Sequence, residues 1–145
     1  MEGNSNRVFF VQAAENGEYE TESLWCQKVE NGYAVDNIPF IVKGISLGDV
    51  ISLEFDEDDQ QYYFEDLVSR SGNSTIRIVF FNREVDEVRD WLNKKNCESE
   101  VLLAKNLVAV NIPHDVDYLP IKQYLDKGEE AGIWSYEESC LVHEY

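Results

Sequence analysis

The chain has 145 residues, with 29 acidic and 12 basic side chains and a formal net charge of -17. A negative field of this size repels the phosphates of nucleic acids and anionic lipids, so we expect binding to neither and favour a basic protein as partner. Hydrophobic residues make up 43% of the chain, which excludes a disordered polymer and is sufficient for one core or two small ones.

The first half of the chain predicts short strands and almost no helix. Asn31 and Gly32 predict a tight hairpin turn between the second and third strands, and Pro39 ends the third. The acidic stretch 56–61 is expected to be the turn between the last two strands. The predicted strands, from their β-branched, aromatic and alternating residues, are 7–11, 19–29, 33–38, 50–55 and 62–69. Five such strands predict a small SH3-like or OB-like β-barrel over residues 1–72.

Beyond a small, polar joint at residues 70–74, the pattern changes to strands that alternate with helices. Val85, Val88 and Leu92 recur at helical spacing within 84–95, with Glu84 in the expected first turn. The second helix is expected to begin near Asp117, and Gly128 and Gly132 to loosen its end. The predicted strands are 76–81, 100–103, 107–112 and 133–141.

This succession is β-α-β-β-α-β, which predicts a ferredoxin-like half over residues 73–145. The fold class is therefore expected to be α+β, with the two halves packed together as one compact unit.

The cysteines and the N-terminal sequence indicate in which cellular compartment the protein is expected. Cys26, Cys97 and Cys140 are odd in number and widely spaced, unlike a disulfide framework. No secretory signal is visible, and no apolar run is long enough to span a bilayer. We therefore expect a cytoplasmic protein with reduced thiols.

Four sequence blocks, 32–40, 44–50, 71–77 and 128–137, resemble family 4265 of the bacterial domains of unknown function. The resemblance covers nearly the whole chain, apart from the first few residues and the tail after Leu141. It implies no catalytic residue, and the acidic run 56–61 matches no feature of the family.

The acidic run is the first candidate site. Its carboxylates lack the alternating ligand spacing and central glycine of an EF-hand loop, so we expect no metal there. A solvated turn and a protein-binding patch remain as alternatives. The neighbouring aromatic residues favour the patch, because strand alternation must expose either Tyr63 or both of its neighbours. The candidate partner-binding residues are Asp56, Glu57, Asp58, Asp59, Tyr62, Tyr63, Phe64 and Trp134.

No pattern predicts catalysis, a cofactor or a metal. Cys140 and His143 form one pair with a two-residue gap, but the other cysteines and His114 are scattered, unlike a structural zinc site. The glutamate pairs 129–130 and 137–138 do not converge, because adjacent side chains point in different directions. We therefore expect no enzyme.

Two functions remain. The first is an immunity protein that neutralises a cognate toxin, of nuclease or ADP-ribosyltransferase type, by occluding a basic active cleft. The alternative is a small-ligand or regulatory module that uses the crevice between the halves. Residues 1–74 contain 15 acidic and 4 basic residues, whereas residues 75–145 contain 14 and 8. This asymmetry favours the inhibitor.

Overall fold

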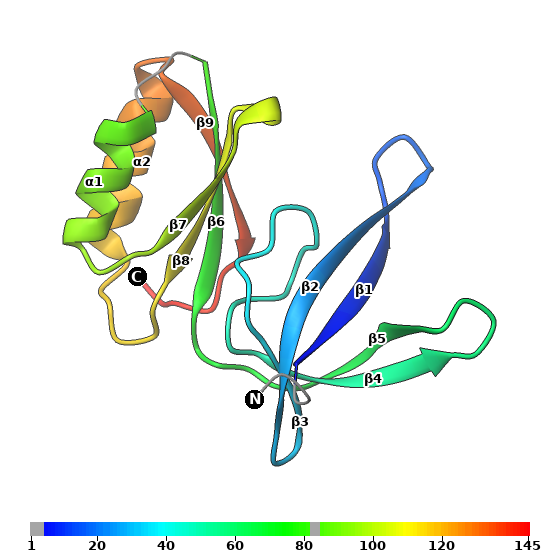
Figure 1. The fold of residues 1–145 in the computed structure, drawn as a ribbon. Coiled ribbons are helices and arrows are strands. Elements are labelled where there is room, and N and C mark those ends of the chain that lie inside the picture. Colours follow the sequence, from blue (N-terminus) through cyan, green and yellow to red (C-terminus); the bar gives the residue numbers. More distant parts are fainter. Residues whose placement is uncertain (1–4, 82–84) are drawn as a thin grey trace.

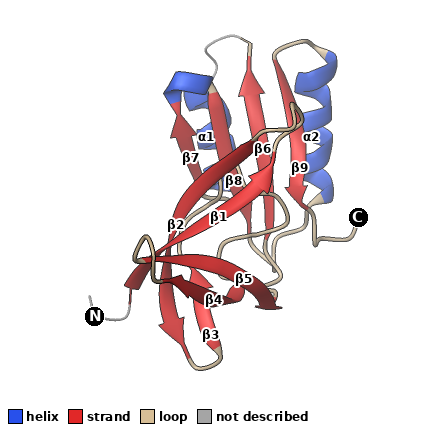
Figure 2. Ribbon diagram, turned by 90° about the vertical axis from the view of Figure 1, so that its right-hand side faces the viewer, coloured by secondary structure: helices blue, strands red, loops and turns tan. Residues whose placement is uncertain are grey.

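The structure is a computed structural model that describes residues 5–81 and 85–145. It is an α+β protein, in which a five-stranded sheet that closes on itself precedes a four-stranded sheet with two helices. Figure 1 and Figure 2 show the helices on one side of the four-stranded sheet and the closed sheet on the other. Within the described residues, no helix has the length and apolar character needed to cross a membrane.

The closed sheet contains β1 to β5 in chain order around the ring. Consecutive strands pair antiparallel, and a parallel pairing of β1 with β5, at Val8–Tyr62 and Phe9–Tyr63, completes the ring. The ring closes at the centre of these strands, since β1–β5 and β3–β4 are each joined at two residue pairs. The strands are β1 (Ser5–Ala13), β2 (Tyr19–Val29), β3 (Gly32–Val35), β4 (Val50–Asp56) and β5 (Gln61–Ser69).

The predicted hairpin between β2 and β3 is present, but its turn lies one residue earlier than predicted. Val29 pairs with Gly32, so Glu30 and Asn31 form the turn and Gly32 is the first residue of β3. A Cβ atom on Gly32 would lie 2.5 Å from the carbonyl oxygen of Ile51. The glycine is therefore needed for the close approach of β3 to β4.

Strand β3 ends at Val35, three residues before the predicted end. The Asp36 N–H donates to the Trp25 carbonyl, and the Asn37 side chain accepts a bond from the Trp25 N–H at 2.6 Å. Because an amide side chain replaces the backbone partner here, the chain leaves the sheet. Residues 36–49 then form a long loop, which we call the β3–β4 loop.

The second sheet has the order β7-β8-β6-β9, and its neighbouring strands are antiparallel. Its elements follow the predicted succession of strand, helix, strand, strand, helix and strand, with one added 3-10 helix. They are β6 (Ser74–Phe80), α1 (Val85–Lys94), β7 (Ser99–Leu102), the 3-10 helix η2 (Leu103–Lys105), β8 (Leu107–Ile112), α2 (Leu119–Glu130) and β9 (Trp134–Cys140).

Most differences from the predicted bounds in this half are small. The first helix begins at Val85, and the predicted first-turn residue Glu84 lies outside the described residues. Asp117, the predicted start of the second helix, precedes it and accepts a hydrogen bond from the Leu119 N–H. Gly128 does not loosen the end of α2 but lies within it, buried beneath Trp134.

Each sheet has its own cluster of buried apolar residues. Residues inside the closed sheet form one cluster with the β3–β4 loop: Val8, Phe10, Leu24, Cys26, Val35, Val42, Ile45 and Ile51. The other is formed by β6, β8 and β9 with both helices, and it includes Ile76, Ile78, Val108, Val110, Leu92, Leu125 and Trp134. Burial of this kind is the main stabilising term for each half.

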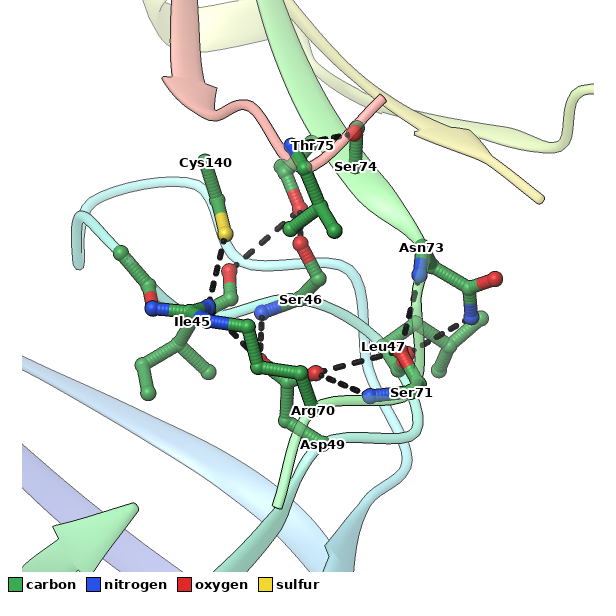
Figure 3. Close-up of polar contacts among 12 residues, drawn as sticks. Ile45, Ser46, Leu47, Asp49, Arg70, Ser71, Asn73, Ser74, Thr75 and Cys140 are labelled. Atoms are coloured by element: carbon green, nitrogen blue, oxygen red, sulfur yellow. Dashed lines mark hydrogen bonds and ion pairs between the residues drawn. The ribbon is translucent and has the colours of Figure 1, made fainter. Parts of the chain in front are cut away.

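The seam between the halves is polar and centres on Asp49, whose side chain has no exposed surface (Figure 3). Its carboxylate accepts hydrogen bonds from the N–H groups of Ser46 and Ser71, both at 2.9 Å, and Arg70 Nη1 lies 3.7 Å from it. The Ser46 hydroxyl is 2.6 Å from the Thr75 hydroxyl on β6. These contacts join the β3–β4 loop to the segment that connects the two sheets.

Candidate partner-binding surface

The β4–β5 hairpin extends from the closed sheet away from the second half (Figure 1). Asp56, Glu57, Asp58 and Asp59 are all exposed at its tip. The carboxylates of Asp56 and Asp59 accept hydrogen bonds from backbone N–H groups within the turn, at 2.9 and 3.1 Å. Those of Glu57 and Asp58 accept none from the described residues. These two hydrogen bonds stabilise the turn, and the carboxylates of Glu57 and Asp58 are available to a partner.

Strand alternation settles how the three neighbouring aromatic residues are arranged. Tyr62 and Phe64 pack against the core of the closed sheet, where Phe64 stacks on Phe10 with ring centroids 5.1 Å apart. Tyr63 points to the outer face, where its ring lies 5.7 Å from that of Phe9. Of the three, Tyr63 is therefore the residue that presents its ring to the outside.

Tyr63 is also coupled to the acidic tip. Its hydroxyl donates a hydrogen bond to the Asp59 carboxylate, which raises the pKa of Tyr63 above its usual value, with smaller contributions from partial burial and from the charges of Asp59 and Asp56. The bond fixes the ring beside the carboxylates, so the aromatic and acidic parts of the hairpin form one surface.

Phe55 borders the acidic tip on the opposite face of the hairpin from Tyr63, and the sequence prediction did not include it. Its ring is 43% exposed and lies 5.0 Å from that of Tyr62. The alternation of β4 places Phe55 on the same face as the buried Ile51, but the hairpin has passed the end of the core at that point. A hollow of about 480 Å³ is lined by Glu54, Phe55, Asp56, Glu57 and Tyr63.

Trp134 lies elsewhere, in the core of the second half. It is 4% exposed, and its indole N–H donates to the Leu125 carbonyl at 2.9 Å. A Cβ atom on Gly128 would lie 1.9 Å from the ring, so the helix needs glycine there. A buried ring has no surface for a partner, and we therefore remove Trp134 from the candidate surface.

Cysteines and histidines do not gather into a metal site in the part of the chain that the structure describes. Cys26, Cys97 and Cys140 are buried free thiols, and burial raises the pKa of both Cys26 and Cys97 to about 12. A buried thiol with so high a pKa is a poor nucleophile.

His143 is bound to residues of the second half and does not pair with Cys140. Its Nδ1 lies 2.6 Å from the hydroxyl of the fully buried Ser74, and its Nε2 lies 2.7 Å from the Pro113 carbonyl, to which it must donate. Nδ1 is then the acceptor for the Ser74 hydroxyl. The pair anchors the C-terminal segment to β6.

The two glutamates of 137–138 turn to opposite faces of β9. Glu137 binds Arg77 at 2.7 Å, on the face toward the closed sheet, whereas Glu138 accepts a hydrogen bond from Tyr118 on the face covered by the helices. The two carboxylates are therefore engaged separately.

A second hollow, which we call the crevice, lies between the halves and has a volume of about 440 Å³. It is bordered by the β1–β2 turn, the β3–β4 loop, and the segment from Leu102 to Leu107. Arg77 and Glu137 of the second sheet also line it. This is the region in which the alternative function predicted a ligand.

Comparison with known proteins places the chain in a family. It is similar to the crystal structure of a hypothetical protein from Neisseria gonorrhoeae, with a TM-score of 0.86, 23% identity and 97% of each chain covered. At this identity the similarity shows a shared fold. No curated protein sequence matches the chain. The model of the family described as domain of unknown function DUF4265 matches residues 22–136, which confirms the resemblance seen in the sequence, and the chain belongs to that family.

Proposed function

We propose that this protein is an acidic inhibitor of a basic protein, specifically an immunity protein that neutralises a cognate bacterial toxin. The toxin would be of nuclease or ADP-ribosyltransferase type, with a basic active cleft that the inhibitor occludes. One observation carries the proposal: the exposed acidic tip of the β4–β5 hairpin lies beside aromatic rings and is fixed to them through Tyr63 and Asp59.

The two parts of this surface suit two stages of binding. Exposed carboxylates accelerate the encounter with a basic partner, by roughly 10- to 1,000-fold in steered systems. Aromatic side chains supply most of the binding energy when an interface closes over them. The hollow beside Phe55 and Tyr63 suits a lysine or arginine side chain of the partner, because these two aromatic residues line it together with the acidic Glu54, Asp56 and Glu57.

The proposed contact residues differ from the sequence prediction in three respects. Phe9 joins the surface because its ring lies beside that of Tyr63, and Phe55 joins because it is exposed and lines the hollow at the tip. Tyr62 and Phe64 support the hairpin from the core side, and Trp134 is removed. The retained contact residues are Asp56, Glu57, Asp58, Asp59 and Tyr63.

We further propose that the protein acts without catalysis and in the cytoplasm, where its three buried thiols would stay reduced. For the fold, we propose an SH3-like first half over residues 1–72 and a ferredoxin-like second half over residues 73–145. The sequential order of β1 to β5 favours the SH3-like over the OB-like assignment, since an OB-fold has Greek-key connections. The order β7-β8-β6-β9 and the succession of elements support the ferredoxin-like assignment.

The test is a pull-down of the tagged protein from its native host, washed at low and then at high salt, with bound proteins identified by mass spectrometry. The proposal predicts a stoichiometric basic partner that resists high salt and loses its toxic activity on addition of an equimolar amount of the inhibitor. No protein partner at either salt, or a partner whose activity is unaffected, would contradict it.

A further inference from the structure

The crevice between the halves contains a cation that is almost completely buried. Arg77 of β6 is 3% exposed and lines the crevice. Its Nε donates to Glu137 Oε1 at 2.7 Å, and its Nη1 donates to the Val42 carbonyl at 3.2 Å. The guanidinium is thus held in place by one residue of its own sheet and one of the β3–β4 loop.

The third nitrogen of this guanidinium is Nη2. Nη2 has no hydrogen-bond partner among the described residues, and it is not one of the enclosed polar atoms without a partner, which are Asn111 Oδ1 and Ser139 Oγ. Since Arg77 lines the crevice, Nη2 is the nitrogen of this guanidinium that a ligand there would meet. A donor on a rigid, buried guanidinium is well suited to a carboxylate or phosphate oxygen, because little side-chain entropy is lost on binding.

Two lysines reach the crevice from opposite walls. Lys43 comes from the β3–β4 loop and Lys105 from the turn before β8. The crevice thus gathers three of the 12 basic residues of a chain with net charge -17. Three carboxylates also line it, those of Glu15, Glu20 and Glu137. Glu137 is bound to Arg77 and lies 3.9 Å from Lys43, and Glu20 accepts a hydrogen bond from the Gln12 amide.

The remaining walls are partly apolar. Phe40 and Ile41 lie on the side of the closed sheet, and Leu102 and Leu107 lie on the side of the second sheet. The volume of about 440 Å³ is within the usual range of small-ligand sites. Such a combination of apolar walls with a few fixed charges is typical of sites for small organic molecules.

We propose that the crevice binds a small organic anion, with a carboxylate or phosphate group on Arg77 Nη2 between Lys43 and Lys105. The apolar body of the ligand lies against Leu102 and Leu107. The site is separate from the acidic hairpin, so this inference does not depend on the proposed inhibitor function. Neither outcome of the pull-down supports or contradicts it.

The experiment is a titration of the 15N-labelled protein with phenyl phosphate, with benzoate and with inorganic phosphate, followed by amide chemical shifts. We expect saturable shifts at residues 41–43, 77 and 102–107 with phenyl phosphate or benzoate, and the tighter of the two identifies the preferred anionic group. Inorganic phosphate, which lacks the apolar body, should bind more weakly.

Two double variants control for charge. Lys43→Gln with Lys105→Gln should weaken binding about 10-fold or more, as expected for the loss of a charge-assisted hydrogen bond. Lys28→Gln with Lys94→Gln removes the same charge from exposed positions outside the crevice and should change the affinity less than about 2-fold. Arg77 is left intact because it also holds the β3–β4 loop. Absence of saturable shifts with both organic anions, or equal effects of the two double variants, would overturn the proposal.

Discussion

Asp49 places a carboxylate without exposed surface at the seam between the two sheets. The cost of removing its charge from water is offset by two backbone N–H groups and by Arg70, and the Ser71 hydroxyl lies 3.1 Å away. The sequence around Asp49 shows a loop but not a buried charge, because Ser71 and Arg70 come from more than twenty residues later. Burial of this residue therefore could not be predicted from the local pattern.

Replacement of this carboxylate should destabilise the fold. In Asp49→Asn, either orientation of the amide places an NH2 group against a backbone N–H of Ser46 or Ser71, so we expect a loss of about 3 kcal/mol in the free energy of unfolding. Urea unfolding followed by tryptophan fluorescence measures this loss. Asp58→Asn, at an exposed position, is the control and should change stability by less than about 0.5 kcal/mol. Equal stability of the two variants would refute this role of Asp49.

Trp134 is a second case in which tertiary contacts decide the role of a residue. Its size and aromatic character made it a candidate anchor for a partner. The structure buries it against Gly128 of α2, at a position where no other residue fits beneath the ring. The glycine was visible in the sequence, but its partner across the α2–β9 contact was not.

At the scale of elements, prediction succeeded where a strand or helix carries its own signals. Strands β2 and β8 have the predicted bounds, because turn residues or proline border their apolar runs. Strand β3 was predicted too long, since its end is set by the side chain of Asn37 bonding to Trp25 on the neighbouring strand. The 3-10 helix η2 was missed for a different reason: it is a single turn of three residues, too short for a periodic pattern.

In the β3–β4 loop, which forms one wall of the crevice, three successive backbone N–H groups are bound by a single carboxylate. Glu22 of β2 accepts hydrogen bonds from the N–H groups of Phe40, Ile41 and Val42, at 2.8 to 3.0 Å. The alternating glutamates of β2 indicate that they share one face of the strand. They do not indicate that one of their carboxylates binds three successive N–H groups of a distant loop.

Loss of this carboxylate should loosen the loop locally. In Glu22→Gln, the charge is removed and one oxygen becomes a donor, so we expect the amides of Phe40, Ile41 and Val42 to exchange with solvent about 10-fold faster or more. Hydrogen exchange followed by NMR measures the rates. Glu30→Gln in the β2–β3 turn is the control and should leave them unchanged. Unaltered exchange in Glu22→Gln would show that other contacts hold the loop.

At the scale of the whole molecule, two features could be predicted in part: the acidic charge of the first half and the crevice between the halves. Composition alone predicted the acidic first half, and strand pairing confirms that its acidic run is an exposed hairpin tip. The sequence allowed the crevice to be placed between the halves, but not its lining to be named, because the lining residues come from loops and strands of both sheets. Only the folded chain shows that the buried Arg77 lines it.

The central claim is that a basic partner docks on the acidic hairpin, and the most direct test is the association rate of the partner obtained by pull-down as a function of salt. The tip variant carries Asp56→Asn, Glu57→Gln, Asp58→Asn and Asp59→Asn. The matched control removes the same four charges from exposed positions of the second half, through Glu98→Gln, Glu100→Gln, Asp115→Asn and Glu130→Gln.

The account predicts that the tip variant associates about 10-fold more slowly at low salt and with a flatter salt dependence, whereas the control stays within about 3-fold of the natural protein. Equal slowing of both variants would show that only the total charge matters, and an unchanged rate in the tip variant would show that the hairpin is not the docking surface. Either result would contradict the account.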